Sequence, residues 1–210
     1  MKNLLFTTPE LLLPEKAAIV GSSGILIASK YGKLIDSFDC VVRFNRAPTI
    51  GFEEDVGSKT DIYVVNNHVF TNQEISGSGW TSEHYPTQPQ FFVRDLKNTN
   101  IYCIGQDLPS YSEVHRHTSI SNGVFYFDYS QMECIRNEFG FAANLGVGTC
   151  FIILCILSNV EVSLFGIDMA DRRRDHYWEE RPPAGPCHNI SNEKAVLNKL
   201  SIDKMVHINV

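Results

Sequence analysis

The chain has 210 residues, of which 43% are hydrophobic and 20% are charged. This length suffices for one compact domain with a sizeable core, so we expect a single domain over residues 1–210. The formal net charge of −6 argues against a polyanion-binding surface and excludes nucleic acid as an expected partner, although a local cluster of donors can still hold a nucleotide.

A short apolar run, Ala17–Val20, leads directly into the sequence GSSG at 21–24. This pattern predicts a buried strand that feeds a tight turn. Glycine lets the backbone approach a ligand closely, and we expect a helix over Ile25–Lys30 whose first N–H groups point at a phosphate. Glycine in this place also serves a plain turn, so the segment alone does not decide between a turn and a nucleotide site.

Further short elements are expected downstream, and they alternate between helix and strand. In chain order they are a helix over Lys33–Phe38, strands over Cys40–Phe44, Asp61–Val65 and Asn100–Gly105, helices over Gln131–Phe139 and Cys150–Leu157, a strand over Glu161–Phe165 and a helix over Ser191–Leu200. Short strands separated by helices predict βαβ units, and therefore a Rossmann-like α/β fold with a mostly parallel, twisted sheet flanked by helices. Ligands of such sheets lie beyond the carboxyl ends of the strands, which groups Gly21, Asn45 and Asn66.

The residues after the second strand carry a more specific pattern. The sequence RFNRAP at 43–48 is followed by GFE at 51–53 and DVGSKTD at 55–61. Together with the GSSG turn, it resembles the long motif of the eukaryotic-type sialyltransferase family over about fifty residues, Ala17–Asn66. The resemblance implies a variant of the GT-A glycosyltransferase fold and assigns Gly21, Ser22, Ser23 and Asn45 to binding of a CMP-activated sugar. Ser22 stands where this family has asparagine.

Two later segments resemble the family's small motif. They are NLGVGT at 144–149, which opens the apolar run Cys150–Leu157, and FGID at 165–168. Gly146 and Val147 stand where the family has hydroxyl side chains, so contacts to the nucleotide would come from backbone N–H groups at the start of a helix. The resemblance adds Gly148, Thr149 and Gly166 to the expected donor contacts.

Two histidines follow in the order that the family's last motifs have. The sequence HYWE at 176–179 resembles the third motif, and His188 with Glu193 has the His-x4-Glu spacing of the very small motif. A single histidine before a helix is more often a cap or a surface residue, but two in this order favour function. The resemblance implies that His188 removes the proton of the acceptor hydroxyl, while His176 and Tyr177 donate to the departing phosphate. A neutral imidazole, with a pKa near ~6.5, suits the first role.

The resemblance implies an inverting transfer of sialic acid from CMP-sialic acid to a hydroxyl of a glycan or glycolipid. The CMP-sugar is a co-substrate, so no cofactor is expected, and since the chain has no Asp-x-Asp triplet we expect no metal. Two alternatives stay open. The donor can be another CMP-ulosonic acid such as CMP-Kdo, because the matching motifs mostly hold CMP, or the chain can be a CMP-binding or glycan-binding module that has lost catalysis.

Pro9, Glu10 and Pro14 interrupt the apolar patches at the start of the sequence, so no run there reaches the roughly 20 apolar residues that would span a membrane. The animal enzymes that this sequence resembles carry a membrane anchor, whereas no such segment is found here. We therefore expect an anchorless, bacterial-like or viral-like member in the cytoplasm, unless an anchor has been removed. The run Arg172-Arg173-Arg174 is either a solvated loop or a contact to an anionic acceptor or a membrane surface. The family's disulfide positions correspond to Ala17 and Asn159, and the six cysteines are therefore expected to be mostly buried free thiols.

Overall fold

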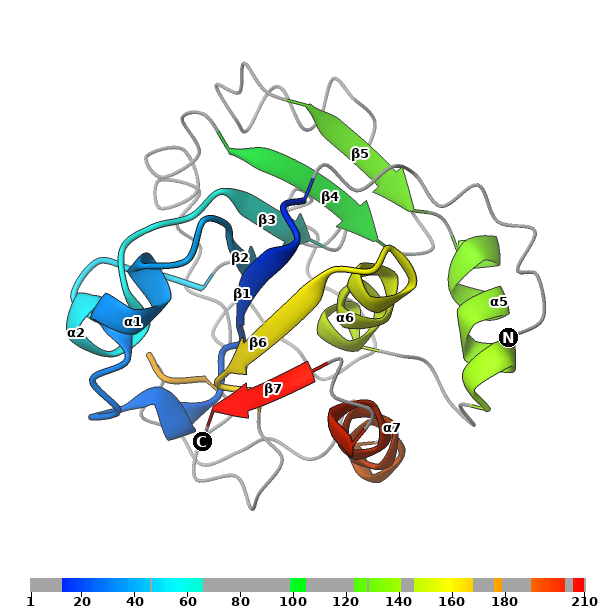
Figure 1. The fold of residues 1–210 in the computed structure, drawn as a ribbon. Coiled ribbons are helices and arrows are strands. Elements are labelled where there is room, and N and C mark those ends of the chain that lie inside the picture. Colours follow the sequence, from blue (N-terminus) through cyan, green and yellow to red (C-terminus); the bar gives the residue numbers. More distant parts are fainter. Residues whose placement is uncertain are drawn as a thin grey trace, which may run out of the picture.

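The computed structural model describes residues 13–45, 47–65, 99–104, 123–127, 129–140, 146–167, 176–178, 190–202 and 206–209. Within this part of the chain, a 7-stranded sheet has the order β5-β4-β3-β2-β1-β6-β7, and every neighbouring pair is parallel (Figure 1). The strands are β1 Lys16–Val20, β2 Val41–Phe44, β3 Ile62–Val65, β4 Asn100–Ile104, β5 Val124–Phe127, β6 Glu161–Phe165 and β7 Val206–Asn209. The predicted parallel α/β sheet is thereby confirmed.

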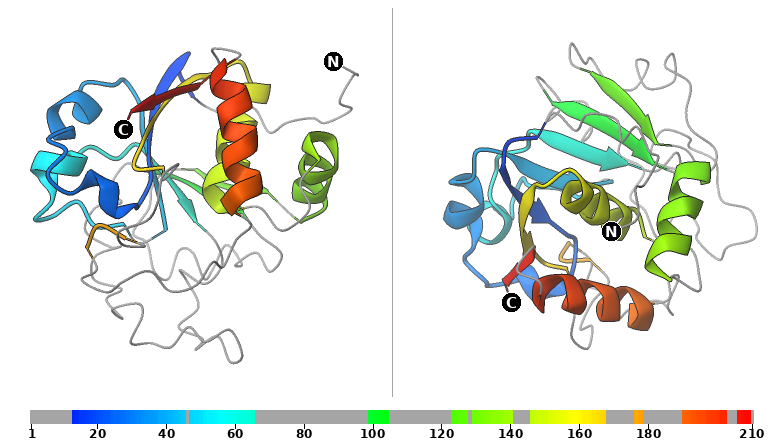
Figure 2. Two further views of the ribbon diagram at one scale, coloured as in Figure 1. Left: turned by 90° about the horizontal axis from the view of Figure 1, so that it is seen from below. Right: turned by 45° about the vertical axis from the view of Figure 1, so that its right-hand side comes forward.

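Helices cover both faces of the sheet. The short helices α1 (Gly32–Asp36) and α2 (Glu53–Val56) lie on one face, and α5 (Tyr129–Phe139), α6 (Val147–Leu157) and α7 (Ile190–Ile202) lie on the other (Figure 2). Successive residues of β1 alternate between these two cores, which explains why the strand reads as a continuous apolar run. None of the helices described is long and apolar enough to cross a membrane.

The order of the strands reverses beside β1. The chain runs outward from β1 through β2, β3, β4 and β5, and then returns to pair β6 with the other side of β1. Such a reversal is a topological switch point, and α/β sheets bind their ligands beyond the carboxyl ends of the strands at this point. The turns that follow β1 and β6 are therefore the first place to look for a site.

The expected helix over Ile25–Lys30 is wrong. Its place is taken by a 3-10 helix of 3 residues, Gly24–Leu26, and by a loop in which Ala28 and Lys30 have φ values of 62° and 59°. A helix would return the N–H groups of Ala28 and Lys30 to nearby carbonyls, whereas both donate to the Asp55 carboxylate, at 2.8 and 3.0 Å. No α-helix therefore begins directly after the turn at 21–24 to aim its N-terminal N–H groups at a phosphate.

The cysteines described are free, and most are buried. Cys40, Cys103, Cys150 and Cys155 are buried and Cys134 is exposed, which confirms the expectation for this part of the chain. Burial raises the pKa of the Cys40, Cys103 and Cys150 thiols to about 12, so these thiols stay protonated and unreactive. Cys187 lies outside the described residues.

Candidate active site

The turns after β1 and β6 interlock at the switch point. The Gly21 N–H donates to the Phe165 carbonyl at 2.7 Å, and the Ser23 N–H donates to the Gly166 carbonyl at 3.1 Å. A Cβ on Gly21 would collide with the Gly166 carbonyl, and a Cβ on Gly166, whose φ is +63°, would collide with the Leu26 side chain. Packing alone thus requires both glycines. The structure brings Gly21, Ser22, Ser23 and Gly166 together at the switch point.

Asn45 extends this edge of the sheet to the next strand. It follows β2 directly, has the left-handed φ of 49°, and donates its N–H to the Val64 carbonyl at 2.9 Å. Asparagine tolerates this conformation better than other residues with a Cβ. Its side chain is half-buried at the carboxyl edge. Asn66, which was grouped with it, lies outside the described residues.

The segment 176–178 is held against the turn after β1. The Tyr177 N–H donates to the Ser22 carbonyl at 2.8 Å, and the Phe52 ring packs edge-on against the Tyr177 ring with 5.1 Å between centroids. Tyr177 therefore brings the preceding residue, His176, to the turn after β1. The imidazole of His176 stacks on the Trp178 indole, with 4.5 Å between ring centroids and 16° between planes.

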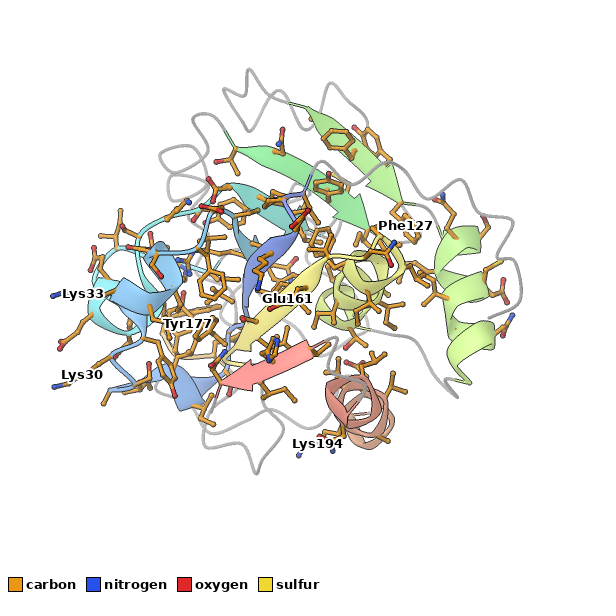
Figure 3. All side chains as sticks on the ribbon, viewed as in Figure 1. Lys30, Lys33, Phe127, Glu161, Tyr177 and Lys194 are labelled. Carbon is orange, nitrogen blue, oxygen red and sulfur yellow. The ribbon has the colours of Figure 1, made fainter. Side chains whose placement is uncertain are left out.

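Tyr177 itself is a packing residue rather than the expected phosphate contact. Its side chain is 2% exposed and lies in the core on the α1 and α2 side of the sheet (Figure 3). Its hydroxyl donates to the Pro48 carbonyl. Burial raises the pKa of this phenol well above its ordinary value, although the Arg43 charge opposes the rise. The assignment of the Tyr177 hydroxyl to a ligand is corrected, because the hydroxyl turns inward to join two loops of the protein.

The N-terminus of α6 is capped from another helix. Both oxygens of the Glu193 carboxylate, in the first turn of α7, take part: Oε1 accepts the Gly146 N–H at 2.9 Å, and Oε2 accepts the Thr149 hydroxyl. A carboxylate in this place satisfies free N–H groups and complements the helix dipole. Glu193 thus accepts the N–H of the N-cap residue Gly146, as the acid of a capping box does, and leaves the N–H groups of the first turn of α6 without a side-chain cap. The Thr149 hydroxyl is engaged within the protein, while Gly148 lies in the first turn of α6.

Glu193 also ties the start of α7 to the start of α6. His188 lies outside the described residues, and α7 begins at Ile190. The turn after β1, Asn45 and His176 thus lie at the carboxyl edge of the sheet. A Cβ on Gly148, in the first turn of α6, would lie 3.7 Å from the Phe44 ring at the end of β2, so the first turn of α6 reaches the same edge, and Glu193 adds the first turn of α7. Among the residues described, no three His, Cys, Asp or Glu side chains gather closely enough to hold a metal ion.

A sequence model of glycosyltransferase family 29 (sialyltransferase) matches residues 13–205. The chain belongs to this family. It is 31% identical to the CMP-N-acetylneuraminate-beta-galactosamide-alpha-2,3-sialyltransferase 1 of Gallus gallus over 171 residues, which are 81% of this chain and 49% of the relative. The Mus musculus protein of the same name is 28% identical over 201 residues, or 90% of this chain and 59% of that protein. The chain thus spans about half the length of the curated relatives it matches.

A solved structure shares the fold of this family 29 chain. It is a mammalian sialyltransferase in complex with Gal-beta-1-3GalNAc-ortho-nitrophenol, with a TM-score of 0.63 and 22% sequence identity over 93% of this chain and 69% of that one. The family predicted from the sequence and its GT-A-like fold are thereby confirmed.

Two charged residues in the long motif of this family 29 chain, Arg43 and Asp36, support the fold. The Arg43 side chain lies in β2 and is 0% exposed, although it carries a charge. Its Nη2 donates to the carbonyls of Val56 and Lys59 at 2.7 and 3.0 Å, and its Nε donates to Lys59 O and Thr60 Oγ1 at 3.1 and 3.0 Å. An arginine between apolar residues of a strand is the sequence signal that could have identified this buried support.

Asp36 anchors the segment that follows α2. Its carboxylate accepts the Ser58 N–H at 2.9 and 3.0 Å, the Ser58 hydroxyl at 3.0 Å and the Lys59 N–H at 2.9 Å. Burial by itself would raise the pKa of Asp36, but these hydrogen bonds and the Arg43 charge together hold it below 3.8.

Replacing Asp36 with asparagine is expected to lower the thermal midpoint at pH 7, because an amide cannot accept all of these hydrogen bonds. A group whose pKa is lower in the folded state stabilises the fold above its unfolded pKa, and this stabilisation is lost as the pH falls through the folded value. The difference in thermal midpoint between wild type and variant should therefore be largest above pH 3.8 and become smaller as the pH falls below it. Thermal melts followed by circular dichroism measure this gap. Asp39→Asn, at an exposed neighbour, is the control; a gap that grows in acid would contradict the assignment.

Proposed function

We propose that this chain transfers sialic acid from CMP-sialic acid to a hydroxyl group of a glycan or glycolipid, with inversion at the anomeric carbon and without a metal ion. The observation that carries this proposal is the 2.8 Å hydrogen bond from the Tyr177 N–H to the Ser22 carbonyl. It joins two segments far apart in the sequence and sets His176 beside the turn at the switch point, where a nucleotide ligand is expected.

The proposed roles follow from this arrangement. The backbone of Gly21–Ser23, the Asn45 side chain and the N–H groups in the first turn of α6 surround the CMP moiety, since N–H groups at a helix start attract a phosphate. His176 donates a hydrogen bond or a proton to the departing phosphate. That phosphate becomes a monoester whose second pKa is near ~6, so hydrogen-bond donors can stabilise it as it leaves.

His188 is the proposed base that deprotonates the attacking hydroxyl. The role comes from the resemblance, and the contact between Glu193 and α6 supports it, because that contact fixes the helix that begins at Ile190 against the proposed phosphate site. A base on the side opposite the leaving phosphate gives inversion.

Release of CMP tests the proposal directly. The purified chain is incubated with CMP-sialic acid or CMP-Kdo and a panel of β-galactoside glycans, and free CMP and sialylated product are measured. Product from CMP-sialic acid supports the proposal, and product from CMP-Kdo alone favours the alternative donor. Tight CMP binding without turnover of either donor would instead identify a binding module that has lost catalysis.

Turnover is expected to persist in excess EDTA. The chain has no Asp-x-Asp triplet with which a divalent ion could bridge a diphosphate, and the proposed leaving group is a monophosphate. Initial rates with and without EDTA measure the effect, and added Mg²⁺ or Mn²⁺ serves as the control. Complete loss of activity in EDTA, restored by either ion, would contradict the proposed site.

Replacing Asn45 with alanine is expected to weaken CMP binding about 5-fold or more, since one lost hydrogen bond is worth roughly 1 kcal/mol. Isothermal titration calorimetry with CMP measures the affinity. Because Asn45 has a φ of 49°, alanine also strains the backbone, whereas glycine does not. Asn45→Gly is therefore the matched control, and equal losses in both variants assign the effect to the amide. Unchanged affinity in both would remove Asn45 from the site.

A further inference from the structure

Asp55 holds the loop that replaces the expected first helix. The loop residues Ala28 and Lys30 have left-handed φ values of 62° and 59°, which residues with a Cβ rarely adopt. Each oxygen of the Asp55 carboxylate accepts one of their N–H groups: Oδ2 accepts the Ala28 N–H at 2.8 Å, and Oδ1 accepts the Lys30 N–H at 3.0 Å. The Ser29 hydroxyl also donates to the Asp55 carbonyl at 3.3 Å. Three consecutive loop residues thus depend on one acidic residue 25 to 27 positions away.

Asp55 sits on a firmly fixed element. It lies in α2, and α1 packs so closely against α2 that a Cβ on Gly32 would overlap the Glu53 carbonyl. The Val56 carbonyl, one residue further, accepts from the buried Arg43 side chain at 2.7 Å. The loop is exposed at Ala28 and Lys30. The rigid partner in this contact is therefore Asp55, and the loop is the part that it restrains.

The restrained loop is continuous with the turn after β1. The Ser29 N–H donates to the Leu26 carbonyl at 3.1 Å, and the Leu26 N–H donates to the Ser23 carbonyl at 3.1 Å. The Ser23 hydroxyl accepts the Ile25 N–H at 3.3 Å, which caps the 3-10 helix. Leu26 is 1% exposed and fills the space that a side chain on Gly166 would need. The conformation of the loop consequently sets the position of both turns at the switch point.

We propose that Asp55 is a positioning residue for the donor-binding turn. Its carboxylate accepts the N–H groups of Ala28 and Lys30, which a helix would have bonded to its own carbonyls. Through the loop it fixes Ser22 and Ser23 against Gly166 without touching the donor. This inference rests on the proposed function for its effect on CMP, but not for the restraint itself. Loss of the carboxylate therefore weakens binding of the donor, while the rate of the fully bound enzyme changes little.

The test compares Asp55→Asn with Glu54→Gln. Glu54 is the matched control, because it is the neighbouring acid on α2 and reaches Lys30 only through an exposed ion pair at 4.0 Å. Cleavage by trypsin after Lys30, identified by mass spectrometry, reports release of the loop. Calorimetry with CMP and steady-state kinetics with CMP-sialic acid report the effect on the site. For Asp55→Asn we expect faster cleavage, CMP affinity and 1/KM lower by about 5- to 30-fold, and kcat within about 2-fold; Glu54→Gln should match wild type.

A second change in the loop separates positioning from general destabilisation. Glycine adopts left-handed φ without strain, so adding Ala28→Gly to Asp55→Asn should slow the cleavage again and restore much of the CMP affinity. If Asp55→Asn fails to fold, Ala28→Pro gives the same test, because proline removes the Ala28 N–H and forbids a φ of 62°.

Three results would overturn the proposal. They are wild-type CMP affinity in Asp55→Asn, a loss of affinity without faster cleavage after Lys30, and equal losses of kcat and affinity that Ala28→Gly does not relieve. A wild-type chain that binds no CMP and transfers no sugar would defeat the proposed function, and with it the role of Asp55 toward the donor. The cleavage arm would still decide whether Asp55 restrains the loop, so the two failures are distinguishable.

Discussion

Replacing His188 with alanine is expected to lower kcat by 10²–10⁴-fold while affinity for CMP stays nearly unchanged, because a general base acts on the acceptor and not on the donor. His176→Ala should instead lower both kcat and CMP affinity, since His176 is proposed to contact the phosphate in the bound donor as well as in the transition state. Initial rates with CMP-sialic acid and calorimetry with CMP separate the two effects.

The contrast between these two histidine variants is the decisive result. His207→Ala is the control, because His207 is exposed in β7 and lies 3.3 Å from Glu161 at the first residue of β6, the opposite edge of the sheet from the proposed site. It should match wild type in both measurements. An equal loss of CMP binding in the His188 and His176 variants would make His188 a donor ligand, and the base would have to be another residue.

Replacing Arg43 with methionine is expected to lower the free energy of unfolding by about 3–5 kcal/mol. The side chain is 0% exposed, and its loss leaves the buried carbonyls of Val56 and Lys59 without their donor. Methionine fills much of the same volume, so the loss reports hydrogen bonding more than a cavity. Arg43→Lys should recover only part of the stability, because one ammonium group cannot reproduce donors at both Nε and Nη2.

Urea unfolding followed by circular dichroism measures this effect, provided that the slope with denaturant is unchanged. Lys33→Met removes an exposed cation from α1 and is the matched control, expected to stay within about 0.5 kcal/mol of wild type. A change of less than about 1 kcal/mol in Arg43→Met would contradict a supporting role.

Sequence patterns predicted the centre of the fold well and its edges poorly. Apolar runs such as Ala17–Val20 and Cys150–Leu157 are buried on both faces or all round, so they identify β1 and α6 without further information. The strands β5 and β7 were missed. Both lie at the edges of the sheet and have only four residues. β7 (VHIN) carries a mixed pattern, whereas β5 (VFYF) is apolar throughout, and this run was the signal that could have identified it.

The contacts that build the site are long-range, which limits prediction from local pattern. The helix expected over Ile25–Lys30 fails because Asp55, remote in the sequence, takes up the N–H groups of that segment. The two hydrogen bonds of Glu193 to the start of α6 span 44 and 47 positions, and no local pattern indicates them. The order of the motifs could group these residues. Only the packed structure shows that the Tyr177 hydroxyl donates to the Pro48 carbonyl and that the Thr149 hydroxyl donates to the Glu193 carboxylate.

The pairing of β1 with β6 has a consequence for synthesis of the chain. Lys16 and Glu161, which are paired in register, lie 145 positions apart. A ribosome that adds ~5–20 residues per second needs roughly 7–30 seconds to cover this distance. Throughout this time one side of an apolar strand has no partner, and such an unpaired edge is a template for aggregation. The edge of β1 that pairs with β6 is therefore without its partner for most of the synthesis of the chain, at the same strand that leads into the turn at the switch point.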